Sequence, residues 1–359
     1  MKVCLLADAA NVHTRKWVDA LTKHNIIVSV ITLRAWNYDN CEVYQLTSKT
    51  YSNRKNDVEY NKMKVALEVI PQVRKLVKQI KPDILHAHYS SSFGLFGALT
   101  FSKPLVVSVW GSDVSAYPVN SVIKTFLTKF VFSRATAICA TSHFLRDVTA
   151  KYTNKEIVIT PFGVDTDLFT PDLTNKNSDV FHVTMIKALE KRYGVGVLLE
   201  AMGQFNEKHK DWKLTIAGEG HDKEYFFQEA ENLSISEKVN FVGIISQHEV
   251  AELLKSSDVH VVPSIVEESF GVSAVEGSSC SVPVIASNIG GIPEVIENNK
   301  TGLLIESNNS NELSKALLKL RNNRDLRTHL GSEGRKLILE RYKWEANVKI
   351  MIKLYRGLI

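Results

Sequence analysis

Short apolar segments alternate with segments of helical spacing along most of the chain. Apolar runs at 2–8 and 26–32 flank the amphipathic segment 14–25. This alternation predicts parallel βα units, because each helix carries the chain back to the start of the next strand. Further strands of this first series are expected at 82–89, 104–111, 137–142 and 156–165. A second series is expected at 180–186, 212–220, 238–244, 258–264, 282–287 and 301–306.

The two series are separated by the stretch 160–180, which holds two prolines, a glycine and a polar run. Such a composition is typical of a linker. A chain of 359 residues, 44% of them hydrophobic, can fill the cores of two domains. We therefore predict an α/β protein of two doubly wound, Rossmann-like domains. The first is expected at 1–170 and the second at 171–341.

The spacing of the cysteines and the N-terminal sequence indicate the cellular compartment of the protein. The four cysteines have no paired spacing and no CxxC, and the opening MKVCLLADAA lacks the features of a signal peptide. No apolar run approaches the ~18 residues of a transmembrane helix. The sequence thus predicts a reduced, cytoplasmic protein.

Charge is distributed unevenly between the halves. Residues 1–170 hold 21 Lys and Arg against 13 Asp and Glu, whereas residues 171–359 hold 23 against 26. A basic first half suits an anionic partner such as phospholipid headgroups, a lipid phosphate or nucleic acid. A surface kept soluble by scattered lysines explains the same count.

The stretch SIVEESFGVSAVEGSSCSVPVIAS, 264–287, places two carboxylates eight positions apart. We expect Glu268 in a loop and Glu276 in a helix that begins near Gly271, because a strand precedes the loop. Eight residues of helix correspond to roughly 80° of rotation, so both carboxylates would face one side of a crevice. The free N–H groups at Gly271, Val272 and Ser273 could bind a phosphate at the positive end of the helix. Each carboxylate can accept hydrogen bonds from the hydroxyl groups of a sugar. A ligand with a phosphate flanked by two sugars is a nucleotide sugar.

A diphosphate leaving group needs positive charge beside it. Lys187, Lys191 and Arg192 follow the first strand of the second series and could supply this charge, although a solvated basic turn is the alternative. Glycines at strand ends allow a backbone to approach a ligand closely, but many βα turns need glycine for geometry alone. The candidates here are Gly218, Gly220 and Gly243.

These motifs resemble the retaining glycosyltransferases of family 4, which have the GT-B fold. The resemblance is carried by HTRKWVDAL, DILHAHY, VSVWGSDV, ATSHFLRDV, VITPFGVDTDLFTP, AGEG and, most specifically, PSIVEESFGVSAVEGSSCSVPVIASNIGGIPEVIENNKTGLLI. It implies a cleft between two domains and a terminal helix, about 342–359, that returns to the first domain. It also implies that Glu276 binds the nucleotide ribose, that Glu268 and the backbone at 270–272, from Phe270 to Val272, hold the donor sugar, and that Lys187 with Lys191 or Arg192 contacts the diphosphate.

The chain departs from the family pattern at several positions. Lys187 stands where many relatives have arginine. Gly277 and Ser278 are expected to loosen the helix, and Ser281 replaces a usual glycine. Trp110 stands where relatives often have a histidine near the reacting sugar, so any such role would pass to Asp113 or His13.

Other residues of the first series are candidates for the acceptor side. Arg15 is expected to face the cleft with His13, while His86 and Trp110 lie at strand ends. His86 and His88 share one face of a strand and could be half of a metal site, but packing or acceptor contact is the favoured interpretation. Asp165 and Asp167 resemble a DxD metal motif, yet they lie in the linker. No metal site is predicted.

The resemblance implies a metal-independent, retaining glycosyltransferase without a cofactor, whose co-substrate is a UDP- or GDP-sugar. The expected acceptor is a saccharide or a lipid-linked saccharide in cell-surface polysaccharide synthesis, such as capsule or lipopolysaccharide, and no nucleic acid partner is expected. The helical stretch 121–135, with three phenylalanines and three cations, is a candidate contact with the inner face of the membrane or, alternatively, a core-facing helix.

Two other classes of function remain open, and a third is poorly supported. A nucleotide-sugar 2-epimerase shares the architecture, but the paired glutamates argue against it. A non-catalytic protein that binds sugars or sugar nucleotides would ordinarily be exported. An NAD enzyme is poorly supported, because the first strand leads into ADAANVHT and not into GxGxxG.

Overall fold

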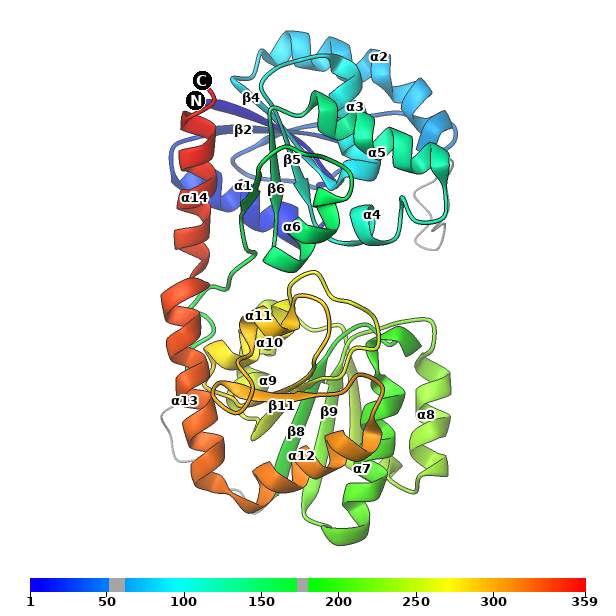
Figure 1. The fold of residues 1–359 in the computed structure, drawn as a ribbon, viewed down its shortest axis with the longest axis vertical. Helices are drawn as coiled ribbons and strands as arrows, with labels where there is room; N and C mark the ends of the chain where they lie inside the picture. Colours follow the sequence, from blue (N-terminus) through cyan, green and yellow to red (C-terminus); the bar gives the residue numbers. More distant parts are fainter. Residues whose placement is uncertain (52–61, 173–179) are drawn as a thin grey trace. The chain divides into compact units, whose positions relative to one another are not determined.

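The computed structural model describes residues 1–51, 62–172 and 180–359. The chain divides into two compact units. Unit 1 contains Met1–Pro161 and Glu345–Ile359, and unit 2 contains Phe162–Trp344. Each unit is a sheet covered by helices (Figure 1). The polar part of the expected linker, 173–179, lies outside the described residues.

Unit 1 is built on a parallel sheet with the strand order β3-β2-β1-β4-β5-β6-β7. Its strands are β1 (Lys2–Leu6), β2 (Ile27–Thr32), β3 (Glu42–Gln45), β4 (Ile84–His88), β5 (Leu105–Val109), β6 (Ala137–Ala140) and β7 (Ile157–Ile159). Its helices are α1 (Val12–Lys23), α2 (Lys62–Ile80), α3 (Gly94–Thr100), α4 (Ser112–Ser115), α5 (Val122–Arg134), α6 (His143–Ala150) and α14 (Trp344–Arg356), with a π turn at Tyr89–Phe93.

Unit 2 repeats this plan with the strand order β10-β9-β8-β11-β12-β13, again parallel. Its strands are β8 (Phe181–Ile186), β9 (Trp212–Ala217), β10 (Val239–Gly243), β11 (Val259–Val262), β12 (Val284–Ser287) and β13 (Gly302–Ile305). Its helices are α7 (Val195–Lys208), α8 (Lys223–Asn232), α9 (Gln247–Lys255), α10 (Val272–Ser279), α11 (Ile292–Val295), α12 (Ser310–Asn322) and α13 (Arg324–Arg341), with 3₁₀ turns at Lys191–Tyr193 and Ser236–Lys238.

The strands form where the sequence is continuously apolar. All of β4, β5 and β11 is buried, as expected for parallel strands covered on both faces. Strand β3 was not predicted, because its sequence EVYQ is short and only half-buried at the sheet edge. In both sheets the strand order reverses beside the first strand, between β1 and β4 and between β8 and β11. Ligands of doubly wound sheets bind at such a point, beyond the carboxyl ends of the strands.

The boundary between the units falls before Phe162 and not after residue 170. Phe162 packs edge-to-face against Phe270, and the carbonyl oxygen of Phe169 accepts hydrogen bonds from Ser279 and Arg335. These contacts attach 162–169 to unit 2. At the other end, Tyr355 of α14 is fully buried in unit 1, where its hydroxyl group lies 2.5 Å from Nδ1 of His86. Helix α14 is therefore a structural part of unit 1.

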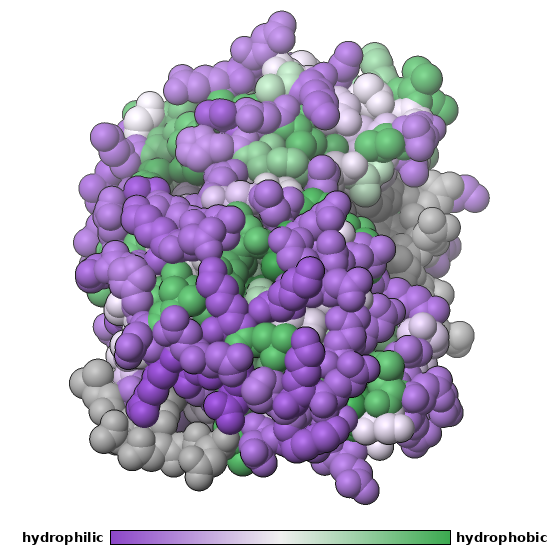
Figure 2. Space-filling model, turned by 60° about the horizontal axis from the view of Figure 1, so that its bottom comes forward, coloured by the Kyte–Doolittle hydropathy of each residue, from purple (hydrophilic) through white to green (hydrophobic). Residues whose placement is uncertain are grey.

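Figure 2 shows one face on which hydrophilic side chains dominate and hydrophobic residues form separate groups. Among the described helices, none combines the length and the hydropathy needed to cross a membrane.

Candidate functional site

Helix α10 begins at the carboxyl edge of the second sheet. Its N-cap is Gly271, whose φ of 92° lies in the left-handed region that favours glycine. As a glycine, Gly271 gives the helix no side-chain cap, so the N–H groups of its first turn can bind an anion. All of 273–279 is buried, including Glu276, which is 5% exposed. The prediction of a helix that begins near Gly271 is confirmed.

A buried histidine of the neighbouring strand supports the first turn of α10. His260 Nε2 lies 2.5 Å from Ser273 Oγ, and its Nδ1 lies 3.3 Å from Thr184 Oγ1 on β8. Burial lowers the pKa of His260 to about 3, so its imidazole is neutral at pH 7. Hydrogen bonds through a fixed, neutral ring thus connect β8, β11 and α10.

The prediction that Gly277 loosens α10 is wrong. The helix continues to Ser279, and a Cβ atom at Gly277 would lie only 3.1 Å from Cδ2 of His260. Glycine allows α10 to pack closely on His260. Ser281, which replaces a usual glycine, does adopt a left-handed φ of 56°.

Glu268 lies in the loop before α10 and is held through both its backbone and its carboxylate. The N–H of Gly291 donates to the carbonyl oxygen of Glu268 at 2.7 Å, and a Cβ atom at Gly290 would collide with the backbone of Glu268. Ser264 donates to Oε1, and Lys187 Nζ donates to Oε2 at 2.8 Å. The side chain of Glu268 is 10% exposed. The structure therefore brings Lys187 of the first βα turn directly against Glu268.

The other two predicted cations lie close by in the 3₁₀ turn Lys191–Tyr193. Lys187 Nζ and the guanidinium carbon of Arg192 lie 4.6 and 4.8 Å from the centre of the Tyr193 ring. Arg192 also pairs with Glu190 at 2.7 Å. Lys191 instead lies over Tyr225 of α8, at 4.0 Å from its ring centre.

The glycines of unit 2 have a packing role. A Cβ atom at Gly218 would lie 2.0 Å from the carbonyl oxygen of Lys187, and one at Gly220 would lie 2.2 Å from that of Leu189. Gly243 has a φ of 73°, and its carbonyl oxygen accepts from the N–H of Gly218. The close approach that Gly218 and Gly220 allow is to the backbone of 187–189, which they hold at the sheet edge.

The side chain of Phe270 belongs to the core. It is 2% exposed, and its ring packs edge-to-face on Tyr342 with the centres 5.4 Å apart. The buried ring leaves only the backbone of Phe270 for a ligand, and the contact of the backbone at 270–272 with the donor sugar stays a prediction. The carboxyl edge of unit 2 thus combines free N–H groups, three cations and two carboxylates, a set that can bind a phosphate together with sugar hydroxyls.

At the carboxyl edge of the first sheet, the ends of β4 and β5 carry a cluster of aromatic and neutral side chains. The ring of Trp110 lies 4.4 Å from that of His88, 5.0 Å from that of Tyr89 and 5.8 Å from that of His13, measured between ring centres. Burial lowers the pKa of His13 to about 4 and that of His88 well below its usual value, so both are neutral at pH 7. The sequence left packing and acceptor contact open for His88, which lies at the end of β4 with its ring beside that of Trp110.

Asp113 and Arg15 both contact other parts of unit 1. The carboxylate of Asp113 accepts from the N–H groups of Ser90, Trp110 and Gly111 at 2.7, 3.1 and 3.0 Å. Its burial raises its pKa. Asp113 therefore positions the loop that carries Trp110. The guanidinium carbon of Arg15 lies 4.4 Å from the ring centre of Trp36.

His86 is unavailable to an acceptor. Like His88, it is 1% exposed, but Nε2 of His88 has no hydrogen-bond partner among the described residues. In His86, Tyr355 binds Nδ1, and Ser108 Oγ lies 2.8 Å from Nε2. Both ring nitrogens thus have protein partners, and His86 attaches α14 to the sheet. His86 therefore does not belong to the acceptor site.

Among the described residues, no group of three or more His, Cys, Asp or Glu side chains is arranged to hold a metal ion. Asp165, from the DxD-like pair, accepts at Oδ1 from the N–H groups of Asp167 and Leu168 at 3.0 and 3.2 Å. This is the geometry of a capped turn.

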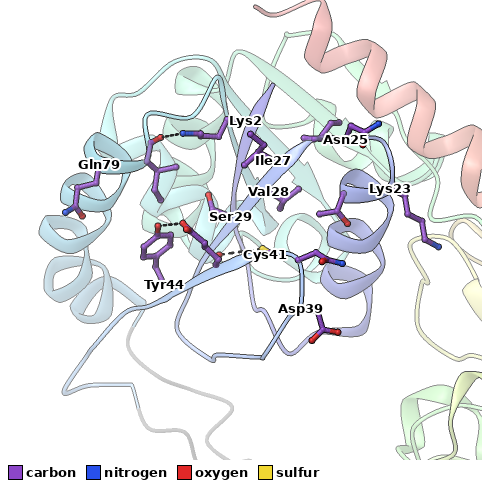
Figure 3. Close-up of a pocket in the computed structure, with 15 residues that line it drawn as sticks. Lys2, Lys23, Asn25, Ile27, Val28, Ser29, Asp39, Cys41, Tyr44 and Gln79 are labelled. Carbon is purple, nitrogen blue, oxygen red and sulfur yellow. Dashed lines mark hydrogen bonds between the residues drawn. The ribbon is translucent and has the colours of Figure 1, made fainter.

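A hollow of about 1180 Å³ lies on the opposite side of unit 1 (Figure 3). Its lining includes Lys2, Ile27 and Glu42, which are the first residues of β1, β2 and β3. It therefore lies at the amino edge of the sheet, away from Trp110 and His88. Ligands of doubly wound sheets bind at the carboxyl edge, so this hollow does not belong to the candidate site.

Comparison with known proteins identifies the family. Residues 170–337 match the family model described as glycosyl transferases group 1, and residues 2–142 match that described as glycosyl transferase 4-like. The chain belongs to the family 4 glycosyltransferases. One relative, the N-acetyl-alpha-D-glucosaminyl L-malate synthase of Bacillus anthracis, is 25% identical over 335 residues, which cover 89% of this chain and 84% of the relative. The chain is therefore a glycosyltransferase enzyme.

Solved structures confirm the fold of this glycosyltransferase. Sucrose-phosphate synthase from Thermosynechococcus elongatus superposes with a TM-score of 0.87 at 21% identity, covering 100% of this chain and 99% of that one. HepE from Anabaena, solved with UDP and glucose, gives a TM-score of 0.82 at 17% identity and covers 100% of both chains. The predicted α/β fold of GT-B type, with two Rossmann-like domains, is confirmed.

Proposed function

We propose that this glycosyltransferase transfers a sugar from a UDP- or GDP-sugar to a saccharide or lipid-linked saccharide, with retention of configuration and without a metal or cofactor. The observation that carries the proposal is the pairing of Lys187 with Glu268 in front of the uncapped first turn of α10. On this proposal, Lys187 and the N-terminus of α10 bind an anion, and the carboxylate of Glu268 beside them accepts hydrogen bonds from sugar hydroxyl groups. The expected pathway is cell-surface polysaccharide synthesis, including capsule or lipopolysaccharide.

The donor is expected to bind entirely to the carboxyl edge of unit 2. Its diphosphate would contact Lys187, Lys191 or Arg192, and the N–H groups at Val272 and Ser273. Glu276 would accept hydrogen bonds from the ribose hydroxyl groups. Glu268 and the backbone at 270–272 would hold the transferred sugar. HepE, which has the same fold, was solved with UDP and glucose, and this supports a nucleotide-sugar donor.

The proposed chemistry needs no protein nucleophile. The bond between the anomeric carbon of the sugar and the diphosphate oxygen breaks, and the acceptor oxygen bonds to that carbon on the same face. The acceptor proton passes to an oxygen of the leaving diphosphate. Lys187 and the helix N–H groups stabilise the charge that develops on this diphosphate, and fixed donors of this kind contribute most where charge appears in the transition state.

The acceptor is expected at the carboxyl edge of unit 1, where His13, His88 and Trp110 form a neutral aromatic wall. An aromatic face suits the C–H face of a sugar ring, and a neutral imidazole can both donate to and accept from hydroxyl groups. Arg15 would lie at the margin of this site. Asp113 would act through the loop at Trp110 and not on the substrate.

The enzyme is expected to work in the cytoplasm, in contact with the inner face of the cell membrane if its acceptor is lipid-linked. The basic character of residues 1–170 supports this part of the proposal.

A thermal-stability panel with UDP-, GDP-, ADP- and dTDP-sugars, each with and without EDTA, tests the donor assignment. A ligand that binds only the folded protein raises its stability by about 2.7 kcal/mol at roughly a hundredfold excess over Kd. We expect a shift with one nucleotide class and no effect of EDTA. No shift with any sugar nucleotide, or a shift abolished by EDTA, would contradict the proposal.

A further inference from the structure

The turn before α5 and the first turns of α5 expose a cluster of apolar side chains. The residues Val119, Val122, Ile123 and Phe126, here called the α5 apolar cluster, are 48%, 88%, 71% and 68% exposed. Single exposed apolar residues are common on soluble proteins, but a group within eight residues of sequence indicates an interaction site.

The rest of α5 explains why these side chains are exposed. Thr128, Val131 and Phe132 are buried, and α5 packs through this part on α3 (Figure 1). Phe130 is partly buried against the same core. The apolar residues that face solvent are therefore those of the first turns. Of the three phenylalanines in the predicted contact 121–135, Phe126 is exposed, whereas Phe130 and Phe132 pack on the core as the alternative interpretation expected.

Two cations flank the α5 apolar cluster. Lys124 and Lys129 are exposed, and neither forms an ion pair with any residue in the described ranges 1–51, 62–172 and 180–359. Lys124 Nζ lies 5.4 Å from the ring centre of Tyr117. Unpaired lysines among exposed apolar side chains have the chemistry that anionic bilayers attract, because apolar groups enter the interface while ammonium groups meet the headgroups.

The α5 apolar cluster lies at the carboxyl edge of the first sheet. Helix α5 leads into β6, and parallel strands begin at the amino edge, so the first residues of α5 lie at the opposite, carboxyl edge. Trp110 directly follows β5, the strand that precedes α4 and α5, and it lies at the same edge. A membrane bound there would bring a lipid-linked sugar to the aromatic wall of unit 1.

We propose that the α5 apolar cluster, with Lys124 and Lys129, docks unit 1 on the surface of an anionic lipid bilayer. This inference names the membrane contact within the proposed function and rests on it for the lipid-linked acceptor. The opposite charge of the bilayer and the exposed apolar side chains favour this occupant over a second copy of the chain, which would bring the same lysines together.

Vesicle flotation of the full chain tests the inference, with vesicles of phosphatidylcholine alone or mixed with phosphatidylglycerol. We expect the wild-type protein to float with the anionic vesicles at low salt. The triple variant Val122→Ser, Ile123→Ser, Phe126→Ser should bind at least about tenfold more weakly. Lys124→Gln and Lys129→Gln should each weaken binding about fivefold on anionic vesicles only. Ile27→Ser, at another exposed apolar residue of unit 1, is the matched control and should float as the wild type does.

The outcomes separate this inference from the proposed function. Flotation needs no sugar nucleotide, and the triple variant should transfer sugar to a soluble acceptor at the wild-type rate. No flotation of the wild-type protein, or equal flotation of the triple variant, would overturn the inference while leaving the donor assignment intact. A self-association that the triple variant abolishes, without flotation of the wild type, would assign the cluster to a second copy.

Discussion

The carboxyl edges of the two sheets have the same topology but different side-chain chemistry. In unit 2 the edge carries three cations and two glutamates, and its loops are held by glycines whose Cβ atoms would collide with the backbone. In unit 1 the ends of β4 and β5 carry a tryptophan and a histidine, with a second histidine beside them, and burial keeps both histidines neutral. The charged residues Asp8 and Arg34, beyond β1 and β2, are paired with each other at 2.6 Å. One edge suits a charged ligand and the other a neutral polyol. The fold therefore determines where ligands can bind, and the side chains determine which ligand each edge accepts.

The largest effect is expected at Glu268. Replacing it with alanine removes the partner of Lys187 and the proposed contact with the donor sugar, so kcat/KM should fall by about 10²–10³. Glu267→Ala is the matched control, because Glu267 is exposed in the same loop. Steady-state kinetics of both variants with one donor and one acceptor provide the measurement. Equal losses in the two variants would remove Glu268 from the site.

Acidification should destabilise both units through their buried histidines. The folded pKa values of His86 and His260 are about 3, below the ordinary value of 6.5, because burial disfavours the charged ring. Below pH 6.5 the unfolded chain binds more protons, so stability falls as pH decreases from 6.5 towards 3. The slope is about 1.4 kcal/mol per pH unit for each histidine.

Urea unfolding between pH 7.5 and 5 measures this slope. Replacing His86 with glutamine should lower the slope of unit 1 by about 1.4 kcal/mol per pH unit, while His13 and His88 continue to contribute. His260→Gln should lower the slope of unit 2 by the same amount. His248→Gln, at an exposed position, should leave both slopes unchanged. A wild-type stability that does not change with pH over this range would contradict the buried, neutral assignment.

A smaller effect is expected from Gly277→Ala. The new Cβ atom would lie 3.1–3.3 Å from His260 and Val284, so the free energy of unfolding should fall by about 1–3 kcal/mol. Gly196→Ala is the matched helical control, since its nearest neighbour would be 3.9 Å away. This control should be neutral or slightly stabilising. If both substitutions stabilise the protein, α10 does not pack on His260 as described.

The smallest effect is expected from His88→Phe, which should change the KM for the acceptor but not the KM for the donor. His88→Phe keeps the ring but removes its hydrogen-bonding nitrogens, so the KM for the acceptor should rise roughly tenfold. The KM for the donor should not change, because donor contacts are assigned to unit 2. A rise confined to the donor KM would show that His88 belongs to the other substrate.

Most of the fold could be predicted because buried parallel strands are continuous apolar runs with helices between them. Strand β3 lacked that signal, since EVYQ is partly exposed and is recognised only through its pairing with β2. Glu268 and the start of α10 could be predicted because a loop carboxylate, a glycine and a helix follow one another in the sequence.

Features that depend on distant contacts could not be predicted. Tyr355, which binds His86, lies 269 positions further along the chain, and no local pattern connects the two. The role of Gly277 depends on His260, which belongs to a different element. Tyr193 and Ser264 were missed because neither is charged, although both contact the Lys187–Glu268 pair.

The most direct test of the central claim is calorimetric titration of nucleoside and nucleoside diphosphate, of the class that the donor panel identifies, into wild type, Lys187→Ala and Glu276→Ala. If the edge of unit 2 binds the diphosphate through Lys187 and the ribose through Glu276, Lys187→Ala will weaken only the diphosphate form. Glu276→Ala will weaken both forms. Unchanged affinities in both variants, or a loss of nucleoside binding in Lys187→Ala, would contradict the account.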